Sequence, residues 1–208
     1  MFEVVLIGLA MNVGLPAGTA LTLAPAADTV PVAWVIDTQA AQARYRVREQ
    51  LAGFDFPNDA VGTTTEVSGT IVMAPDGRIQ AEGSEIRVDL ASLATDNQRR
   101  DGYVRRRTLE VEEYPEAILV PRRVVGLEGP LPESGSRTFQ LEADLTLHGH
   151  TNTLTWDVMA TFAPDTITGL ATTAFTFDTF QIAVPSVARV LSVADNIRLE
   201  LEFRLVPK

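Results

Sequence analysis

The alternation of apolar and polar residues is the feature that most constrains how this chain can fold. It is clearest in residues 139–147, where apolar side chains occupy every second position: Phe139, Leu141, Ala143, Leu145 and Leu147. Successive side chains of a β-strand point to opposite faces, so this spacing buries one face and exposes the other. Residues 154–162 and 197–205 repeat the spacing. We therefore predict strands that each have one buried face.

Weaker alternation and turn residues extend this prediction along the chain. Further strands are expected at residues 43–47, 67–73, 86–90, 117–125 and 167–177. The Pro75-Asp76-Gly77 sequence predicts a turn, because proline presets φ, aspartate caps the turn and glycine accepts a positive φ. About eight or nine strands joined mostly by short links predict an antiparallel meander. Closure removes exposed sheet edges, so we expect an all-β fold, a closed antiparallel barrel of about eight strands.

Residues 92–113 break the alternation and are rich in helix-forming residues. We predict a short helix near residues 97–109, with Thr95 or Asp96 as its N-cap, which ends before Tyr114-Pro115. Such a helix is expected to cross between strands and to cover one opening of the barrel.

The first segment, residues 1–27, differs from the rest because Glu3 is its only charged side chain. Its apolar run is short for a membrane span and is followed by small residues at positions 24–27, as in signal-peptidase sites. We predict an export signal, with a buried first strand or a membrane anchor as the alternatives. Residues 28–208 then form one domain, which we expect to be periplasmic or secreted.

Composition excludes several kinds of chemistry. The 208 residues include no cysteine, which rules out disulfides, thiolate metal sites and a cysteine nucleophile. A formal net charge of −10 argues against binding to nucleic acid, whose phosphates need a basic surface. His148 and His150 flank Gly149 and are interpreted as exposed hairpin residues rather than metal ligands. The sequence contains no nucleophile-elbow or phosphate-loop motif, so we predict no enzyme activity, no metal and no cofactor.

An arginine cluster contrasts with this acidic composition. Its five members lie within nine residues: Arg99, Arg100, Arg105, Arg106 and Arg107. One interpretation is a basic rim that contacts anionic lipid head groups, or the phosphate or carboxylate of a ligand. The other is a solvated helix face that pairs with neighbouring acidic residues, because surface ion pairs are common and weak.

Four stretches of the sequence carry a resemblance to a known family. They are VSGTI at 67–71, VDLASLAT at 88–95 followed by Asn97 and Arg100-Asp101, ADLTLHG at 143–149, and residues 180–195 with the final strand. Together they resemble the YceI-like family over about residues 32–207. The second stretch is the most specific, because it is similar to a family strand that ends in Ser-Leu-x-Thr and is followed by Asn-x-x-Arg-Asp, which opens the helix. Three positions depart from the family pattern: Gln181 and Ala143 replace glycine, and Leu119 replaces phenylalanine.

The resemblance implies a lipocalin-like barrel that is exported and binds, stores or transports a long isoprenoid lipid or quinone without catalysis. We expect inward apolar side chains to line its cavity: Phe139, Leu141, Leu145, Trp156, Val158, Phe175, Phe177, Leu199 and Phe203. Arg100 is expected at the cavity mouth, where it either meets a ligand head group or locks the helix through Asp101. A transient contact with a membrane surface and a monomeric or homodimeric state are also expected.

Two other functions stay open on the sequence alone. A barrel filled by its own side chains would bind no ligand and would act as an envelope stress or interaction protein. An enzyme would need polar groups that converge at the barrel mouth, and the sequence shows no such set.

Overall fold

The computed structural model describes residues 30–74, 76–127, 129–188 and 190–208, so the predicted export signal lies outside the described residues. Ten β-strands share one sheet, and a short helical segment interrupts them. In chain order the elements are β1 (Val32–Ile36), β2 (Gln42–Leu51), β3 (Asn58–Thr64), β4 (Val67–Met73), β5 (Ile79–Asp89), α1 (Gln98–Tyr103), the π-helical turn η1 (Val104–Thr108), β6 (Glu116–Val125), β7 (Gly135–Leu147), β8 (His150–Ala163), β9 (Thr166–Phe175), the 3₁₀ turn η2 (Phe177–Phe180) and β10 (Val190–Pro207).

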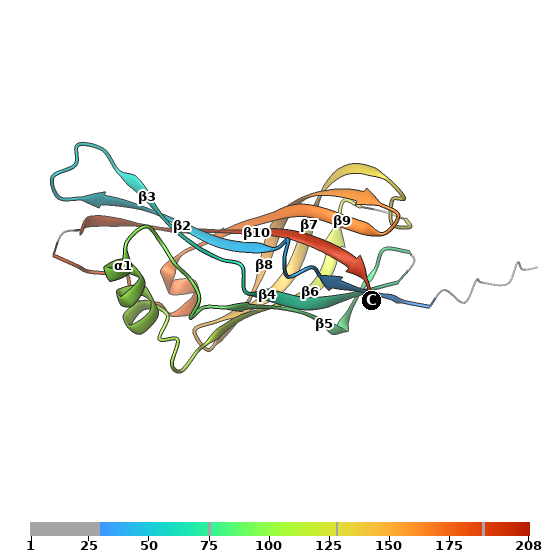
Figure 1. Cartoon of the computed structure of the whole chain (residues 1–208), viewed down its shortest axis with the longest axis horizontal. Helices are drawn as coiled ribbons and strands as arrows, with labels where there is room; N and C mark the ends of the chain where they lie inside the picture. The colour runs from blue at the N-terminus through green and yellow to red at the C-terminus, as the bar shows by residue number, and fades with distance from the viewer. Residues whose placement is uncertain (1–29, 75, 128, 189) are drawn as a thin grey trace, which may run out of the picture.

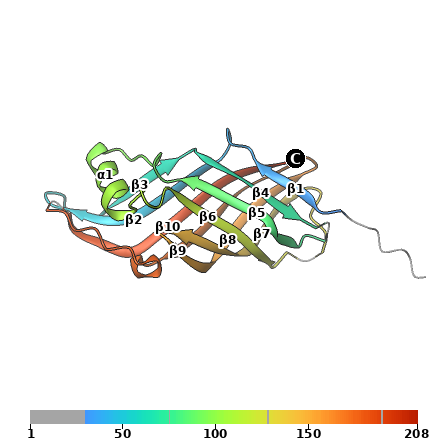
Figure 2. The same cartoon turned by 90° about the horizontal axis from the view of Figure 1, so that it is seen from below.

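The long strand β10 closes the sheet into a barrel. One of its edges pairs with β9, and the other pairs first with β2 and then with β1. Strands β1 and β2 follow one another in the chain and share the same edge of β10, so together they form one long, broken barrel strand. Strands β3 and β4 pair with β2 and β1 respectively, and together they form a second broken barrel strand. The ring is therefore a closed antiparallel barrel of eight strands, which confirms the predicted fold class (Figures 1 and 2).

The sequence patterns did not predict β1, which is a run of five apolar residues without alternation, or β3. Strand β3 is the longer of these two. Its inward positions are Ala60, Gly62 and Thr64, which are too small or too polar to produce a hydrophobic alternation. Gly62 lies opposite Tyr45 of β2, and a Cβ at this glycine would come within 2.2 Å of the tyrosine ring. Glycine is therefore required here by the close approach of the ring, a requirement that only the pairing of the strands reveals.

The predicted helix is confirmed, but its cap is different. The Asn97 side chain accepts hydrogen bonds from the backbone N–H groups of Arg99 (3.0 Å) and Arg100 (3.3 Å), so Asn97 is the N-cap. The expected caps, Thr95 and Asp96, precede the helix, because the Thr95 hydroxyl bonds instead to the Asn97 carbonyl and to Asp101. After α1 the chain continues through η1 to Thr108.

The helical segment occupies a place where the barrel wall is incomplete. Strands β4 and β5 pair from Val67 and Val88 onward, but among the described residues β3 joins the segment after β5 through one isolated backbone bridge, between Thr63 and Ala94, and a hydrogen bond between the Thr64 and Ser92 hydroxyls. Figures 1 and 2 both show α1 at this end of the barrel, beside the β2–β3 hairpin and opposite the C-terminus. The helical segments of the described chain are too short to span a bilayer.

Candidate ligand-binding cavity

A cavity of about 640 Å³ lies inside the barrel at the end that carries α1. Its wall is mainly apolar and is contributed by strands from around the barrel, by α1 and η1, and by η2 with the segment that follows it. Ligand pockets in proteins commonly measure about 300–1,000 Å³ and are lined mostly by apolar side chains. The cavity is thus large enough for a ligand and has a suitable lining.

The strand register divides the barrel interior into two parts. We call the part around the cavity the hollow half, and its buried lining includes Ile86, Leu119, Leu145, Leu147, Ile197 and Leu201. We call the other part the packed half, and its buried side chains include Trp34, Ile36, Ile71, Met73, Phe162 and Leu205. Among the described residues, none of this second set lines the cavity. The same strands therefore run from a filled interior into a hollow one.

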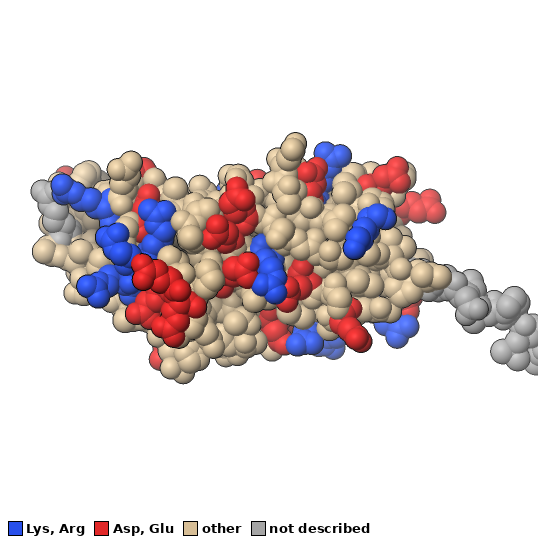
Figure 3. Space-filling view, turned by 60° about the horizontal axis from the view of Figure 1, so that its bottom comes forward, with Lys and Arg blue, Asp and Glu red and all other residues tan. Residues whose placement is uncertain are grey.

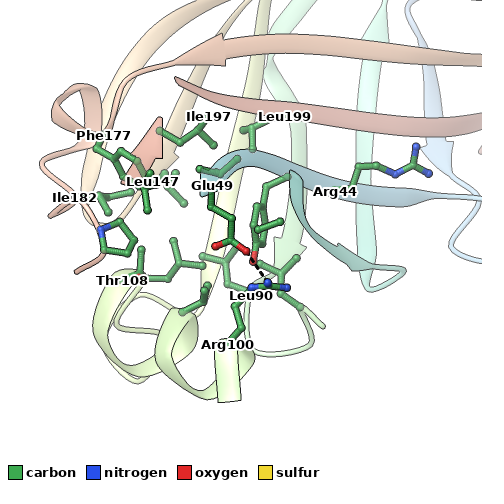
Figure 4. Close-up of a pocket in the computed structure, with 18 of the residues that line it drawn as sticks. Arg44, Glu49, Leu90, Arg100, Thr108, Leu147, Phe177, Ile182, Ile197 and Leu199 are labelled. Carbon is green, nitrogen blue, oxygen red and sulfur yellow. Dashed lines mark hydrogen bonds and ion pairs between the residues drawn. The ribbon is translucent and has the colours of Figure 1, made fainter. Parts of the chain in front are cut away.

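An ion pair in the wall joins α1 to the barrel. Arg100 donates to the carboxylate of Glu49 on β2 at 2.6 Å, and the Glu49 residue is only 7% exposed (Figure 4). A second guanidinium nitrogen of Arg100 binds the exposed Asp96, also at 2.6 Å. A buried carboxylate needs such a partner, because an unpaired charge in an apolar wall is strongly unfavourable. Arg100 lines the cavity, and its positive charge is already paired with the carboxylates of Glu49 and Asp96.

The helix is fixed, but not by the expected pairing of Arg100 with Asp101. These residues are adjacent on α1, so their side chains diverge and bind different partners. Asp101 accepts hydrogen bonds from the backbone N–H (2.9 Å) and the hydroxyl (2.6 Å) of Thr95. Asp101 thus holds the loop before the helix, whereas Arg100 ties the helix to β2 through Glu49.

Two ionisable groups in the wall around the cavity have shifted pKa values. Burial raises the pKa of Tyr45 to about 12, and nearby carboxylates add to this shift against the opposing charge of Arg100. Burial also raises the pKa of Glu200, but hydrogen bonds from Arg46 and Arg44 outweigh it and hold the pKa below its usual value. The tyrosine therefore stays neutral and the glutamate stays ionised at neutral pH.

Polar atoms without protein partners are few in the wall. Among the described residues, Thr108 Oγ1 and Trp156 Nε1 are buried and make no hydrogen bond within the protein. Both residues line the cavity, so each supplies one donor in an otherwise apolar surface. No group of three His, Asp or Glu side chains among the described residues could hold a metal ion.

The histidines differ from the expectation that both are exposed. The His148 side chain is only 15% exposed, and its Nε2 lies 3.0 Å from the Glu110 carboxylate. Its ring also packs on Tyr114, with the ring centroids 4.9 Å apart. His148 and Gly149 form the two-residue β7–β8 turn with φ values of 51° and 76°, and this turn directs the His148 ring toward the segment after η1.

Comparisons with known proteins identify the fold family. The family model of the YceI-like domain matches residues 34–205. The chain belongs to the YceI-like domain family. None of the curated proteins matches the chain.

Solved structures share the YceI-like fold at low sequence identity. A polyisoprenoid-binding domain from Saccharophagus degradans, implicated in plant cell wall breakdown, is 12% identical with a TM-score of 0.64, and the match covers 85% of this chain and 99% of that domain. BcnA from Burkholderia cenocepacia is 16% identical with a TM-score of 0.60 and coverages of 81% and 98%. The YCEI protein of Campylobacter jejuni is 15% identical with a TM-score of 0.57 and coverages of 76% and 90%. At these identities the likeness concerns the fold alone.

The YceI-like barrel brings together five of the nine residues expected to line the cavity. Those in the wall are Leu145, Trp156, Phe175, Phe177 and Leu199. The other four, Phe139, Leu141, Val158 and Phe203, belong to the core but lie outside the cavity wall. Six of the nine belong to the buried core, and Phe139, Leu199 and Phe203 are partly buried and pack against it, so alternation identified the inward face. It did not distinguish the hollow half from the packed half, because that depends on position along the barrel axis.

Glu49 is the main residue of the YceI-like cavity that the sequence patterns did not reveal. Strand β2 places Ala43, Tyr45, Val47 and Glu49 at alternate positions, so the carboxylate continues the inward face. An acidic residue in register with an apolar face is a signal that could have identified it. Its partner could not have been identified in this way, because the contact spans 51 positions of sequence.

Gln181 occupies a position where the family usually has glycine, and the structure shows what this substitution requires. The residue follows η2 in the left-handed region, with φ of 53° and ψ of 34°. Glycine enters this region without steric cost, whereas glutamine is strained there. Glutamine at this position therefore makes the turn after η2 less favourable than glycine would, but the turn still forms.

Proposed function

We propose that this YceI-like domain binds a long isoprenoid lipid, of the polyprenyl or quinone type, in the hollow half of its barrel. The observation that carries the proposal is the apolar cavity of about 640 Å³. An alkyl chain gains about 0.8 kcal/mol for each CH₂ group moved out of water, so such a wall binds a lipid tail without a charged anchor. The Saccharophagus degradans domain of the same fold is described as polyisoprenoid-binding, which supports this class of ligand.

The charges of the cavity wall favour binding over catalysis. Glu49 is paired with Arg100, and Glu200 is paired with Arg44 and Arg46. General acid–base chemistry needs a group within reach of the substrate whose proton is free to move. These groups instead neutralise one another, which suits a container for an apolar chain. The proposed role is therefore storage or transport of the lipid.

The direct test is mass spectrometry of organic extracts from the natively purified full chain. A stoichiometric isoprenoid is expected from a host that makes one. Extracts from several hosts that contain no isoprenoid would overturn the proposal and would favour a ligand-free interaction protein.

A pair of variants makes this test specific to the cavity. Leu145→Glu places a charge in the wall, so it should abolish loading. Thr146→Glu changes the next residue of β7, which faces the other side of the sheet, and should load normally. Ala117→Phe fills the cavity without a charge and should also reduce loading. Normal loading of folded Leu145→Glu and Ala117→Phe proteins would show that the ligand lies elsewhere.

We also propose that residues 1–27 direct export and are removed, which would place the mature domain in the periplasm or outside the cell. The small residues at positions 24–27 support this proposal. N-terminal sequencing of protein recovered from the periplasmic fraction should begin close to Asp28. Recovery of the intact N-terminus from the cytoplasm alone would contradict it.

A further inference from the structure

Exposed apolar side chains gather at the end of the barrel that holds the cavity. Two segments carry five of them, the tip of the β2–β3 hairpin and the stretch from the end of η2 into β10. We call this set the apolar tip, and it consists of Phe54, Phe56, Val184, Val187 and Leu191. Phe54 is 67% exposed, Phe56 81% and Leu191 66%. The two segments are adjacent because Leu51 pairs with Val190.

The apolar tip is continuous with the cavity. Phe54 and Val187 are exposed to solvent and also line the cavity wall. The hairpin is held in place at its base, where the Gln50 side chain donates a hydrogen bond to the Phe54 carbonyl at 2.6 Å. Contiguous exposed apolar patches on soluble proteins commonly mark a surface that binds another protein or a membrane.

Basic side chains lie beside this tip. Arg99 belongs to α1, and Arg105, Arg106 and Arg107 belong to η1. We call these four residues the basic band. None of them forms an ion pair with a described residue, although Arg105 donates to the Ala91 carbonyl at 3.0 Å. Figure 3 shows basic side chains at this end of the molecule, beside acidic ones.

Several neighbouring acidic side chains have other partners, whereas Asp55, which lies between two residues of the apolar tip, and Glu112 form no ion pair among the described residues. Asp96 pairs with Arg100, Glu110 with His148, and Asp59 with Arg48. Glu113 accepts a hydrogen bond from the Tyr114 hydroxyl. The arginines of the basic band can therefore bind an external anionic group, although the net charge of the whole protein is −10.

We propose that the apolar tip and the basic band together dock the cavity end of the barrel onto an anionic lipid bilayer. In this arrangement Phe54 and Phe56 enter the interface between head groups and acyl chains, and the arginines contact lipid phosphates. Exposed aromatic side chains flanked by arginines match the two requirements of such a surface, apolar burial and charge attraction. The docking goes beyond the proposed function, because contact with a bilayer requires no bound isoprenoid.

The test uses tryptophan fluorescence of the full chain with vesicles. Phe56→Trp places a reporter in the apolar tip, and the emission of the native tryptophans, Trp34 and the cavity residue Trp156, is subtracted by measuring the unsubstituted chain with the same vesicles. With vesicles of phosphatidylcholine and phosphatidylglycerol, the Phe56→Trp emission should shift to the blue. Vesicles of phosphatidylcholine alone should produce a much smaller shift.

Matched variants separate docking from other forms of vesicle contact. Met159→Trp places the reporter at another exposed position, which is 56% exposed and lies on β8, and its emission should not shift. In the Phe56→Trp background, Arg106→Gln with Arg107→Gln should weaken vesicle partitioning by roughly tenfold or more, and added salt should weaken it further. Phe54→Ser should also weaken it, with an unchanged circular dichroism spectrum as the control for folding.

Several results would overturn the proposal. These are the absence of a shift at position 56 with anionic vesicles, equal shifts at positions 56 and 159, equal partitioning to neutral vesicles, or no effect of the double arginine variant. Residues 1–29 are common to all variants, so vesicle contact through them would not be weakened by Arg106→Gln with Arg107→Gln. Because the readout does not depend on isoprenoid loading, an empty cavity would refute the proposed function and leave this test intact.

Discussion

The packed half and the hollow half of the barrel share strands and alternation but have different interiors. In the packed half, β1 closes the ring by pairing with both β4 and β10, and large side chains such as Trp34 and Phe162 fill the space. In the hollow half, β3 has a single backbone bridge to the segment after β5, and the α1 segment completes the wall. The difference shows that alternation determines which face lies inside but not whether the inside is filled.

The two halves also differ in what holds their walls together. The packed half relies on direct contacts between buried apolar side chains. The hollow half relies in addition on a polar joint, because Arg100 of α1 pairs with the buried Glu49 of β2. A wall around a cavity loses the contacts that a filled core would provide, so other interactions must position it. Substitutions in each half should therefore have different effects.

The largest expected effect is a loss of packing in the packed half. Phe162→Ala should lower the free energy of unfolding by about 3–5 kcal/mol, because Phe162 is 4% exposed and its removal leaves a new cavity. Phe177→Ala is the matched change in the hollow half and should cost about half as much, because that ring already borders empty space. Urea unfolding of both variants measures the difference, and equal losses would contradict the division into halves.

A second prediction concerns the polar joint of the hollow half. Glu49→Gln should lower the free energy of unfolding by about 2–3 kcal/mol, because it leaves Arg100 without its buried partner. Amide hydrogen exchange should become faster in α1 and η1 and stay unchanged in β7 and β8. The control is Arg123→Gln, which removes an exposed pair with Glu142 on the barrel surface and should cost less than about 1 kcal/mol. Unchanged exchange in α1 would show that the pair does not hold the helix.

A third prediction follows from the buried Tyr45 of the hollow half. The folded-state pKa of Tyr45 is about 12, above the ordinary value of 10. The contribution of the neutral phenol to folding stability is therefore fully present below pH 10 and is lost as the pH rises toward 12. Folding stability should therefore fall by about 1–2 kcal/mol in this window, an amount that Tyr45→Phe should abolish. Unfolding measured across this pH range in both proteins tests the prediction, and identical pH profiles would contradict it.

The smallest expected effect is the pH-dependent contribution of Glu200, a buried carboxylate of the barrel wall. Its pKa is lowered in the folded state because hydrogen bonds from Arg46 and Arg44 outweigh burial. Its stabilising contribution is therefore present above the ordinary pKa of 4.5 and is lost as the pH falls through the folded value. Glu200→Gln should flatten the acid limb of the stability profile by less than about 1 kcal/mol. A steeper acid limb in the variant would contradict the direction of the shift.

The sequence predicted much of the fold and part of the site. Alternation located the long strands β7, β8 and β10, and helix-forming residues located α1. It did not predict β1, because that strand is a short apolar run without alternation, or β3, because a glycine and other small residues form its inward face. Five cavity residues were predicted together with four that lie outside the cavity wall, since inward residues at different heights of a barrel have the same spacing.

The contacts that build the cavity wall could not be predicted from local patterns. Glu49 and Arg100 lie 51 positions apart, and the adjacent Arg100-Asp101 sequence suggested a pairing that helix geometry prevents. Similarly, the exposed His148 that a hairpin turn predicts is drawn against Tyr114 and Glu110, which come from a distant segment.

The sequence by itself determined most of the strands, the inward face of those strands and the family, because these depend on local spacing and motifs. Only the tertiary structure decided where the barrel is hollow, which charges are neutralised and which arginines remain outside ion pairs among the described residues. The physical reason is that the volumes of facing side chains decide whether the barrel interior is filled, and the charges of neighbouring side chains decide which ion pairs form. Strand register and barrel closure determine which side chains face one another, and these residues are remote in sequence.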